Sequence, residues 1–345
     1  MKRVIYVSVL MVLVLTALTS CSGKKSGGQE AAVTAQATIP EPVVDNETNL
    51  LLKGLVSSGD YVNSQEYPSL IKASLVNSAD MSKNLVIDIR PSDQFKAGHI
   101  KGAVNKRFED LPAYFESGIK PFEYDKIILV CEDGQTSSYA TCLLRLRGYG
   151  NVYAMRWGMS GWNKRFADES WLKNLSGKFE SQLDTVTHQK PLPGTMPVLK
   201  TGFSSEKEIA DSRFREVFSA GTGSVLVTAD EVFSNPSSFY VINLERKDKY
   251  NDGHVPGAVR YKPDGTLGIL KEMATIPTGK TVVVYCGTGH NSAFATAYLR
   301  LFGYDARTLR YGNNSFMHDR MIKQKAALSW LPFSIADVND FSVVK

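Results

Sequence analysis

The chain has 345 residues, and its 40 Lys and Arg against 35 Asp and Glu give a formal net charge of +5. Removal of a leader that carries Lys2 and Arg3 lowers that charge to +3, which is too small to indicate a nucleic-acid partner. The roughly 300 residues behind such a leader suffice for two domains of ordinary size. Length and charge therefore favour a two-domain globular protein.

The N-terminus has the pattern of an export signal. Two basic residues precede an apolar run over residues 4–19. This run is shorter than the roughly 20 residues of a membrane span and is typical of a signal-peptide core. The segment Leu18-Thr19-Ser20-Cys21 resembles the lipobox of bacterial lipoproteins, so we expect a signal peptide over residues 1–20 and lipidation of Cys21. The alternative is a plain secretory signal with an incidental cysteine.

Residues 21–50 are expected to form a flexible tether. Gly, Ser, Lys, Ala, Thr and Pro dominate this stretch, and it has few large apolar residues to bury. Ser22, rather than an acidic residue, follows Cys21. In bacterial lipoproteins this favours location in the outer membrane over retention in the inner membrane. We therefore expect a lipid anchor in the bacterial cell envelope, with the folded part facing the periplasm.

One pattern of residues occurs twice in the chain, with a constant spacing between the two copies. Asp88 is followed after 155 positions by Asn243, and Cys131 is followed after the same 155 positions by Cys286. The first copy reads Asp88, Phe95, Gly98, His99, Gly102, Ala103, Val104, Cys131, Gly134, Ser137, Gly148 and Tyr149. A constant shift over about sixty residues indicates a duplicated domain.

Strands and helices are expected to alternate in both copies. Short apolar runs rich in β-branched residues predict strands over residues 85–89, 126–130, 151–154, 239–242 and 281–285. Apolar residues at helical spacing predict helices over residues 137–147 and 292–302, with Gly148 as the stop signal of the first. Such alternation predicts the α/β class, with each domain a mainly parallel sheet covered by helices on both faces.

These elements define two domains and a connection between them. We expect the first domain over residues 51–180 and the second over residues 201–345. The stretch 181–200 contains several prolines and a histidine and no clear periodicity, so it is interpreted as the linker.

Three cysteines follow Cys21, namely Cys131, Cys142 and Cys286. An odd number excludes a complete set of intramolecular disulfides, and the spacing lacks a CxxC pair typical of zinc sites. Cys142 lies among apolar residues of a predicted helix and is interpreted as a core thiol. No metal or other cofactor is expected, and the remaining thiols are candidates for chemistry.

The other two cysteines each begin a loop between a strand and a helix. Loop one is Cys131-Glu132-Asp133-Gly134-Gln135-Thr136-Ser137, and loop two is Cys286-Gly287-Thr288-Gly289-His290-Asn291-Ser292. Ligands bind at this place in open α/β sheets, because loop amides and the following helix N-terminus converge there. We therefore expect both loops to bind substrate and to shift their thiols toward the nucleophilic thiolate.

Taken together, these motifs resemble those of rhodanese domains, and the whole chain is similar to a tandem-domain rhodanese-like sulfurtransferase. The segments that carry the resemblance are Asp88-Ile89-Arg90, Gly98–Ala103, loop one, Gly158–Trp162, Gly253–Ala258 and loop two. The resemblance implies that a loop cysteine attacks a sulfane sulfur, holds it as a persulfide and passes it to a nucleophilic acceptor.

The two halves depart from the family pattern in different ways. Asn243 and Glu245 stand where the family has aspartate and arginine, and Lys249 stands where a basic residue often meets the anionic end of the donor. The first half has Gln94 at that position. Loop one carries Glu132 and Asp133, which we expect to repel a dianion and to raise the pKa of Cys131. Cys286 is therefore predicted to be the main catalytic residue and Cys131 the lesser one.

Several other side chains have simpler interpretations. His99 and His254 lie in Gly-His turns and are expected to fix those turns by hydrogen bonds. His290 lies inside loop two, where it would either tune the Cys286 thiolate or face water. Trp157 and Trp162 are interpreted as packing residues.

The predicted function is sulfur transfer from a small anionic donor, such as thiosulfate or 3-mercaptopyruvate, to a thiol or cyanide acceptor. One alternative is a carrier that binds sulfur, selenium or tellurium without turnover, with an envelope redox protein as partner. Another is a binding module in which neither cysteine acts. A phosphatase is disfavoured, because its loop needs an arginine six residues after the cysteine, where Ser137 and Ser292 stand.

Overall fold

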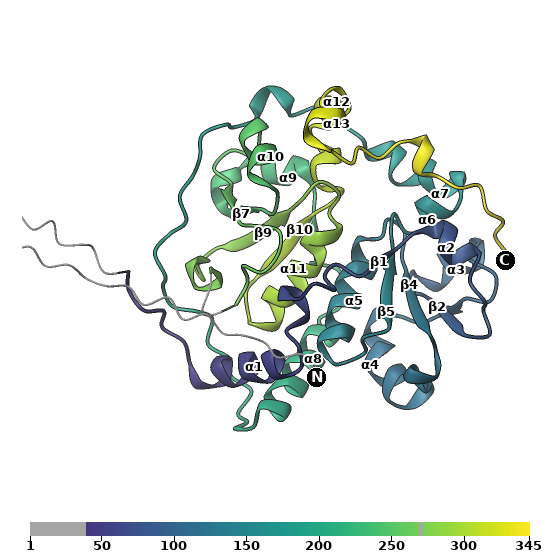
Figure 1. The fold of residues 1–345 in the computed structure, drawn as a ribbon, viewed down its shortest axis with the longest axis horizontal. Coiled ribbons are helices and arrows are strands. Elements are labelled where there is room, and N and C mark those ends of the chain that lie inside the picture. Colours follow the sequence, from purple (N-terminus) through teal and green to yellow (C-terminus); the bar gives the residue numbers. More distant parts are fainter. Residues whose placement is uncertain (1–38, 269–271) are drawn as a thin grey trace, which may run out of the picture. The chain divides into compact units, whose positions relative to one another are not determined.

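Two parallel five-stranded sheets organise the protein, one in each copy of the repeat (Figure 1). The computed structural model describes residues 39–268 and 272–345. The predicted signal peptide, Cys21 and most of the tether lie outside the described residues. Residues 46–50, at the end of the expected tether, form the start of helix α1 (Asn46–Ser57).

The two sheets have the same topology. The first has the order β1-β5-β4-β2-β3 and the second has the order β6-β10-β9-β7-β8, with every pair parallel. Their strands are β1 (Leu70–Ile71), β2 (Asn84–Asp88), β3 (Val104–Asn105), β4 (Lys126–Val130), β5 (Val152–Met155), β6 (Leu226–Val227), β7 (Phe239–Asn243), β8 (Val259–Arg260), β9 (Thr281–Tyr285) and β10 (Ala306–Leu309). The predicted α/β class with two parallel sheets is confirmed.

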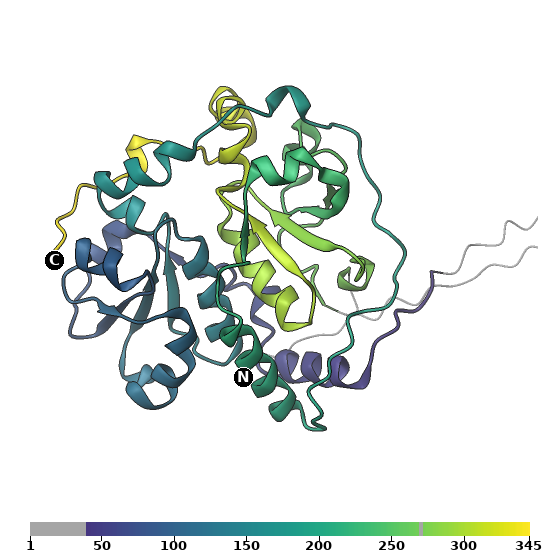
Figure 2. The ribbon, with the colours of Figure 1, turned by 180° about the vertical axis from the view of Figure 1, so that it is seen from behind.

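Helices flank each sheet (Figures 1 and 2). After α1 they are α2 (Ala73–Asn77), α3 (Ser92–Ala97), α4 (Leu111–Ala113), α5 (Gln135–Leu146), α6 (Met159–Trp162), α7 (Lys164–Glu169), α8 (Glu206–Ser219), α9 (Ala229–Ser234), α10 (Lys247–Asp252), α11 (His290–Leu301), α12 (His318–Lys323) and α13 (Lys325–Leu328). Among the described residues, no helix combines the length and the apolar character that a membrane crossing requires.

The side chains of each strand divide between two cores. In β4, Ile127 and Leu129 belong to the largest apolar cluster, whereas Ile128 and Val130 belong to a cluster on the other face of the sheet. This separation follows from the period of two along a strand. The largest cluster contains residues of both sheets, so the two halves share one core.

Helices α5 and α11 lie between the two sheets and pack against each other within that shared core. Each begins directly after a glycine with positive φ, Gly134 at 88° and Gly289 at 78°. Both helices start two residues earlier than predicted, since these glycines let the chain turn sharply from the loop into the helix. The last residues of both cysteine loops therefore belong to the interface between the halves.

The segment that follows each half contacts the other half. Backbone hydrogen bonds join Asp184, in the expected linker, to His254 of the second half, and join Val344, near the C-terminus, to His99 of the first half. Figures 1 and 2 show the C-terminal segment running to the first sheet, near α6 and α7. Both connections tie the halves together in addition to the shared core.

Candidate active site

The two cysteine loops face each other across the interface between the halves. A Cβ atom added to Gly134 would lie 2.5 Å from the His290 Nε2 atom, and one added to Gly289 would lie 2.3 Å from the Gln135 Oε1 atom. Each loop glycine therefore accommodates the first helical side chain of the opposite loop. A larger residue at either glycine would push the halves apart.

Two reciprocal hydrogen bonds hold this arrangement. The Trp157 backbone N–H donates to His290 Nε2 at 3.2 Å, and the Tyr311 backbone N–H donates to Gln135 Oε1 at 2.8 Å. Trp157 and Tyr311 follow the last strand of their halves and have left-handed φ values of 66° and 64°. This unusual backbone conformation turns their amides toward the opposite loop.

His290 is a neutral interdomain contact. Its Nε2 atom accepts a hydrogen bond, so its proton is on Nδ1, which lies 2.9 Å from the Thr288 hydroxyl and donates to it. Burial, with a contribution from the Arg156 cation, lowers the pKa of His290 to about 3. Because the side chain is 1% exposed, the expectation that it faces water is wrong. The structure shows a role in joining the halves.

In loop one, the Cys131 thiol is enclosed by its own loop. Its sulfur accepts the backbone N–H groups of Gly134 at 3.1 Å and Ser137 at 3.3 Å, and the Ser137 hydroxyl lies at 3.4 Å. An Asp133 carboxylate oxygen lies 3.7 Å from the sulfur. Burial, and then the Asp133 charge, raises the pKa of Cys131 to about 12.

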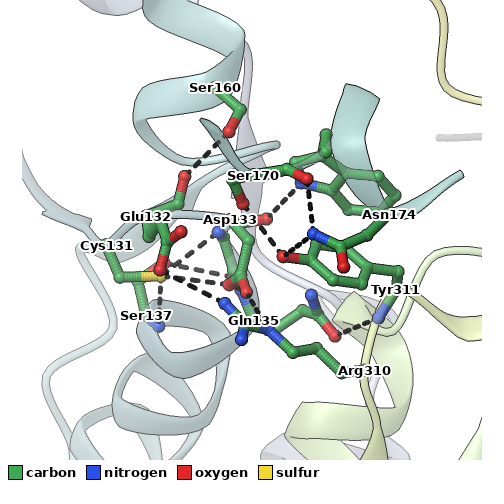
Figure 3. A network of polar contacts seen from close by, with 12 residues as sticks. Cys131, Glu132, Asp133, Gln135, Ser137, Ser160, Ser170, Asn174, Arg310 and Tyr311 are labelled. Carbon is green, nitrogen blue, oxygen red and sulfur yellow. Dashed lines mark hydrogen bonds and ion pairs between the residues drawn. The ribbon is translucent and has the colours of Figure 1, made fainter. Parts of the chain in front are cut away.

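The carboxylates of loop one are neutralised by the second half (Figure 3). Arg310, directly after β10, donates from Nε to Asp133 at 2.9 Å and from Nη2 to Glu132 at 3.2 Å. Asp133 also accepts the Gln135 N–H at 3.0 Å. The predicted effect of Asp133 on the pKa of Cys131 is confirmed, whereas the pairing of both carboxylates with an arginine of the other half was not predicted.

Cys131 does not line any of the five cavities described for residues 39–268 and 272–345. One hollow, of about 210 Å³, is bordered by a residue of loop one. It is lined by Arg90, Gln94, Ala97, Glu132, Arg165, Phe166 and Glu169. Of the loop-one residues predicted to bind substrate, only Glu132 borders it, whereas Asp133, Gly134, Gln135, Thr136 and Ser137 do not.

Loop two is arranged differently. Cys286 borders a cavity of about 330 Å³ with walls from both halves. The first half contributes Pro68, Leu70, Arg156 and Trp157, and the second half contributes Leu244, Glu245, Lys249, Pro263, Gly287, Thr288, Asn291 and Leu331. The predicted residues Gly287, Thr288, Asn291 and Lys249 thus surround the thiol, whereas Gly289 and His290 pack against the first half. The Ser292 hydroxyl lies 3.6 Å from the Cys286 sulfur.

Lys249 is not a free cation in this cavity. Its Nζ atom lies 3.5 Å from the Glu245 carboxylate and 4.7 Å from the centre of the Trp330 ring. Burial raises the pKa of Glu245, and the Lys249 charge opposes that rise. The two opposite charges compensate each other within the protein, and the donor-binding role of Lys249 stays a prediction.

The pKa of both thiols is raised, which confirms the prediction for Cys131 and contradicts the expected shift of Cys286 toward thiolate. Burial, and then the Glu245 charge, raises the pKa of Cys286. Backbone groups of Thr288 and Ser292 act in the opposite direction but are weaker. Each of the two cysteines is 5% exposed, and the loss of water around the sulfur outweighs the favourable loop amides.

The other interpreted side chains lie away from this chemistry. His99 Nδ1 contacts the Phe95 carbonyl and His254 Nδ1 contacts the Tyr250 carbonyl, as expected for residues that fix turns. Cys142 is fully buried within α5. Trp162 is also buried, whereas Trp157 both packs in the interface and borders the Cys286 cavity.

Within the described residues, one group of side chains has a geometry suited to a metal ion. Ligand atoms of Asp184, His188 and His254 lie within 4.8 Å of one another. Asp184 and His188 already contact each other at 2.6 Å, and Asp184 also accepts backbone N–H groups of Val186 and Gly257. These contacts hold the linker against the second half and are separate from both cysteine loops.

Arg156 and Arg310 were not among the residues predicted from the sequence to contribute to the site. The signal was present, because Met155-Arg156-Trp157-Gly158 and Leu309-Arg310-Tyr311-Gly312 repeat the order apolar, arginine, aromatic, glycine. Their distance is 154 positions rather than 155, so they fall just outside the constant-shift repeat. Gly158 and Gly312 have positive φ, and an added Cβ would lie 2.4 Å from the Cys131 carbonyl oxygen and 2.0 Å from that of Cys286. Each glycine therefore lets this turn press against the cysteine loop of its own half.

The chain belongs to the rhodanese-like domain family. The family model named "Rhodanese-like domain" matches residues 72–165 and 199–319, which together are more than half of the chain. The two matched segments contain the two cysteine loops.

Relatives with assigned names match only part of the chain. A tRNA uridine(34) hydroxylase of Rickettsia canadensis is 30% identical over 104 residues, which are 29% of this chain and 39% of that protein. A protein of the same name from Teredinibacter turnerae is 29% identical over 104 residues and is covered to 30% of its length. The chain thus spans well under half of either relative.

Solved structures with similarity include sulfurtransferases. The thiosulfate sulfurtransferase of Pseudomonas aeruginosa is 16% identical, with 77% of this chain and 46% of that chain covered and a TM-score of 0.28. A probable thiosulfate sulfurtransferase is 19% identical, with 70% of this chain and 95% of that chain covered and a TM-score of 0.25.

Proposed function

We propose that the protein is a sulfurtransferase in which Cys286 carries the transferred sulfur. The observation that supports this most strongly is the cavity of about 330 Å³ at Cys286, because a donor must bring its sulfur atom into contact with the thiol. The cavity is bordered by an uncharged loop, and both halves contribute to its walls. Membership in the rhodanese-like family supports the same chemistry.

The reaction proceeds in two displacements at sulfur. In the first, the Cys286 thiolate attacks the transferable sulfur of the donor, which is the sulfane sulfur of thiosulfate or the thiol sulfur of 3-mercaptopyruvate. An S–S bond forms, and the S–S bond of thiosulfate or the C–S bond of 3-mercaptopyruvate breaks. The leaving group takes the electron pair and departs as sulfite from thiosulfate, or as the enolate of pyruvate from 3-mercaptopyruvate, which then takes a proton. In the second, a thiolate or cyanide attacks the outer sulfur and Cys286 departs as thiolate.

The two cysteines are unequal in this proposal. Cys131 has the same place in its half, but Asp133 lies beside its sulfur and Arg310 holds Asp133 there. An approaching anionic donor would have to displace a paired, buried carboxylate, which is costly. Cys286 has no such neighbour within its loop, because Gly287 and Thr288 occupy the corresponding positions.

A carrier without turnover is the second candidate, and the burial of both thiols favours it. The sulfur atoms belong to side chains that are 5% exposed, which hinders a bulky acceptor from reaching a bound persulfide. A carrier would load one sulfur, selenium or tellurium atom and release it only to a specific redox partner. Multiple turnovers with excess donor and cyanide separate the two functions, because a carrier stops after one equivalent.

Mass spectrometry tests the central proposal. The purified full chain is incubated with thiosulfate or 3-mercaptopyruvate, digested without reductant, and the peptides are examined. We expect a gain of one sulfur atom on the peptide that contains Cys286. Absence of this gain with every donor, while the protein remains folded, would overturn the proposed chemistry.

The cellular location is a separate proposal that rests on the sequence alone. We propose that Cys21 is lipidated and that the lipid anchors the protein to the cell envelope, on its periplasmic side. Two or more acyl chains give stable attachment, whereas one is marginal. Cys21→Ala is expected to move the protein out of the membrane fraction or to leave the precursor uncut, and unchanged size and fractionation would contradict the anchor.

A further inference from the structure

The duplicated fold places one arginine at the corresponding point of each half. Arg156 follows β5 directly and Arg310 follows β10 directly. Each precedes the aromatic residue whose backbone amide donates to the opposite loop. The two arginines therefore stand in equivalent places, each next to the cysteine loop of the other half.

What the two arginines meet is different. Arg310 meets Asp133 and Glu132 of loop one, at 2.9 and 3.2 Å. The equivalent positions of loop two are Gly287 and Thr288, which have no charge. Arg156 borders the cavity that contains Cys286, and it also borders a second hollow together with Lys72 and Asp337.

The described part of the chain provides no ion-pair partner for Arg156. Burial lowers the pKa of Arg156, and the only compensating influence is the charge of Asp337. The Asp337 carboxylate borders the second hollow with Arg156 but makes no ion pair with it, and it accepts the backbone N–H and the hydroxyl of Ser334 at 3.0 and 3.2 Å. A half-buried guanidinium without a partner is costly, and a bound anion would relieve that cost.

We propose that Arg156 forms an anion-binding subsite of the Cys286 cavity, which binds the carboxylate of a monoanionic sulfur donor. This inference rests on the proposed sulfurtransferase function and assigns its donor class. The first half of the chain would thereby supply the specificity of the reaction at the cysteine of the second half.

The charges around the cavity select a monoanion. Lys249 and Glu245 form one compensated pair, and His290 is neutral. Arg156 thus contributes one positive charge that is not held in an ion pair within the described residues, and a single carboxylate would neutralise it. A dianion such as thiosulfate would leave one negative charge close to the buried Glu245, which is unfavourable.

The chain itself shows the type of group that fits. At the equivalent point of the first half, Arg310 is bound by the carboxylates of Asp133 and Glu132 (Figure 3). These side chains occupy the place that a carboxylate donor would take beside Arg156. Guanidinium groups match carboxylates in both charge and planar geometry. An α-keto thiol acid, of which 3-mercaptopyruvate is the simplest probe, has such a carboxylate.

A matched pair of donors tests the subsite. 3-Mercaptopyruvate and mercaptoacetone share the same thiol and ketone, but mercaptoacetone has a methyl group in place of the carboxylate. Persulfide formation at Cys286 is measured with both donors in the full-length wild type and in Arg156→Gln, Arg156→Lys and Arg310→Gln variants. The ratio of kcat/KM for the two donors removes effects that a general structural change would exert on both.

In the Arg156→Gln variant, we expect kcat/KM for 3-mercaptopyruvate to fall at least about tenfold, mainly through KM, because a charge-assisted hydrogen bond is lost. The value for mercaptoacetone stays within about twofold. Arg156→Lys recovers part of the loss, since it retains the charge without the planar fork. Arg310→Gln leaves the ratio of the two donors unchanged.

Two results would overturn the subsite. One is an unchanged kcat/KM for 3-mercaptopyruvate in Arg156→Gln, and the other is an equal loss with both donors. In either case the wild type still forms a persulfide at Cys286, so the proposed sulfurtransferase function survives. If the wild type forms no persulfide with any donor, the proposed function fails first, and the subsite falls with it.

Discussion

The two halves share strand order, loop position and a cysteine at the same point, yet they present that cysteine in opposite ways. In loop one, acidic side chains at positions 132 and 133 bind the arginine of the other half and close the site. In loop two, glycine and threonine at the equivalent positions leave a cavity open at Cys286. We infer from this comparison that the side chains at these two positions decide whether the site of each half is occupied by the protein or open to a ligand.

The largest expected effect comes from the cysteines themselves. Cys286→Ser is nearly isosteric and is expected to lower turnover with 3-mercaptopyruvate by at least about a hundredfold, because a hydroxyl is a far weaker nucleophile than a thiol. Cys131→Ser is expected to change turnover by less than about threefold. Steady-state assays with cyanide as acceptor measure both. If Cys131→Ser abolishes turnover and Cys286→Ser leaves it intact, the roles of the two halves are reversed.

The arginines are expected to differ in their contribution to stability. Arg310→Ala leaves Asp133, whose side chain is 2% exposed, without its cation. Breaking a buried ion pair lowers the free energy of unfolding by about 3–5 kcal/mol. Because Arg310 is one-third exposed, we expect a smaller loss of about 2–3 kcal/mol. Arg156→Ala breaks no ion pair, so we expect less than about 1 kcal/mol.

Urea unfolding at neutral pH measures this difference through the midpoint at a constant slope. Asp133→Asn combined with Arg310→Ala serves as the control, because it removes both charges and is expected to recover part of the lost stability. Equal destabilisation by Arg310→Ala and Arg156→Ala would show that the Asp133 pair has no special role in closing loop one.

The sequence predicted the elements with strong local signals. Strands β4 and β9 match their predicted bounds, because each is a run of β-branched residues buried on both faces of a sheet. The cysteine loops followed from the repeat. The short edge strands β1, β3, β6 and β8 have two residues each and show no detectable period.

The electrostatics of the site could not be predicted in the same way. The contacts of Arg310 with Asp133 and of Trp157 with His290 join residues 177 and 133 positions apart. They depend on how the halves pack, which a pattern within one half does not specify. The pKa of the Cys286 thiol was misjudged because burial is the main cause of its rise, and a sequence pattern does not give the burial of a single side chain.

Loop one can be converted toward loop two. Glu132→Gly with Asp133→Thr removes both carboxylates and also frees Arg310. In a Cys286→Ser background, we expect persulfide formation at Cys131 from 3-mercaptopyruvate to rise about ten- to a hundredfold, since one or two like-charge contacts are lost and a cation is gained.

Salt and a third substitution sharpen that experiment. The gained rate is expected to decrease at high ionic strength, because screening weakens the attraction of the donor to partly exposed Arg310. Addition of Arg310→Gln is expected to remove much of the gain. If the double replacement leaves the rate unchanged, the carboxylates do not close the site and another feature of loop one must do so.

The smallest effect is the response of the thiols to pH. Burial raises the pKa of both cysteines, to about 12 for Cys131, and the ordinary value for a cysteine is about 8.5. A raised pKa means that the thiolate fraction is small at neutral pH. As long as the pH is below the pKa, this fraction increases tenfold for each unit by which the pH rises. Alkylation by iodoacetamide, which consumes the thiolate, is therefore expected to accelerate about tenfold per unit between pH 6.5 and 8.5, without a plateau.

The alkylation rates of the two cysteines are expected to have the same pH dependence but different magnitudes. Cys286 has an open cavity, so we expect its peptide to be labelled before that of Cys131 at every pH, while the fully buried Cys142 remains unlabelled. Peptide mass spectrometry after timed labelling measures each cysteine separately. Glu245→Gln is the matched change, because the Glu245 charge is the second cause of the raised pKa of Cys286, and it is expected to speed labelling at Cys286 alone. A rate plateau below pH 8 at Cys286 would show that its thiolate is already favoured, and that the loop amides outweigh burial after all.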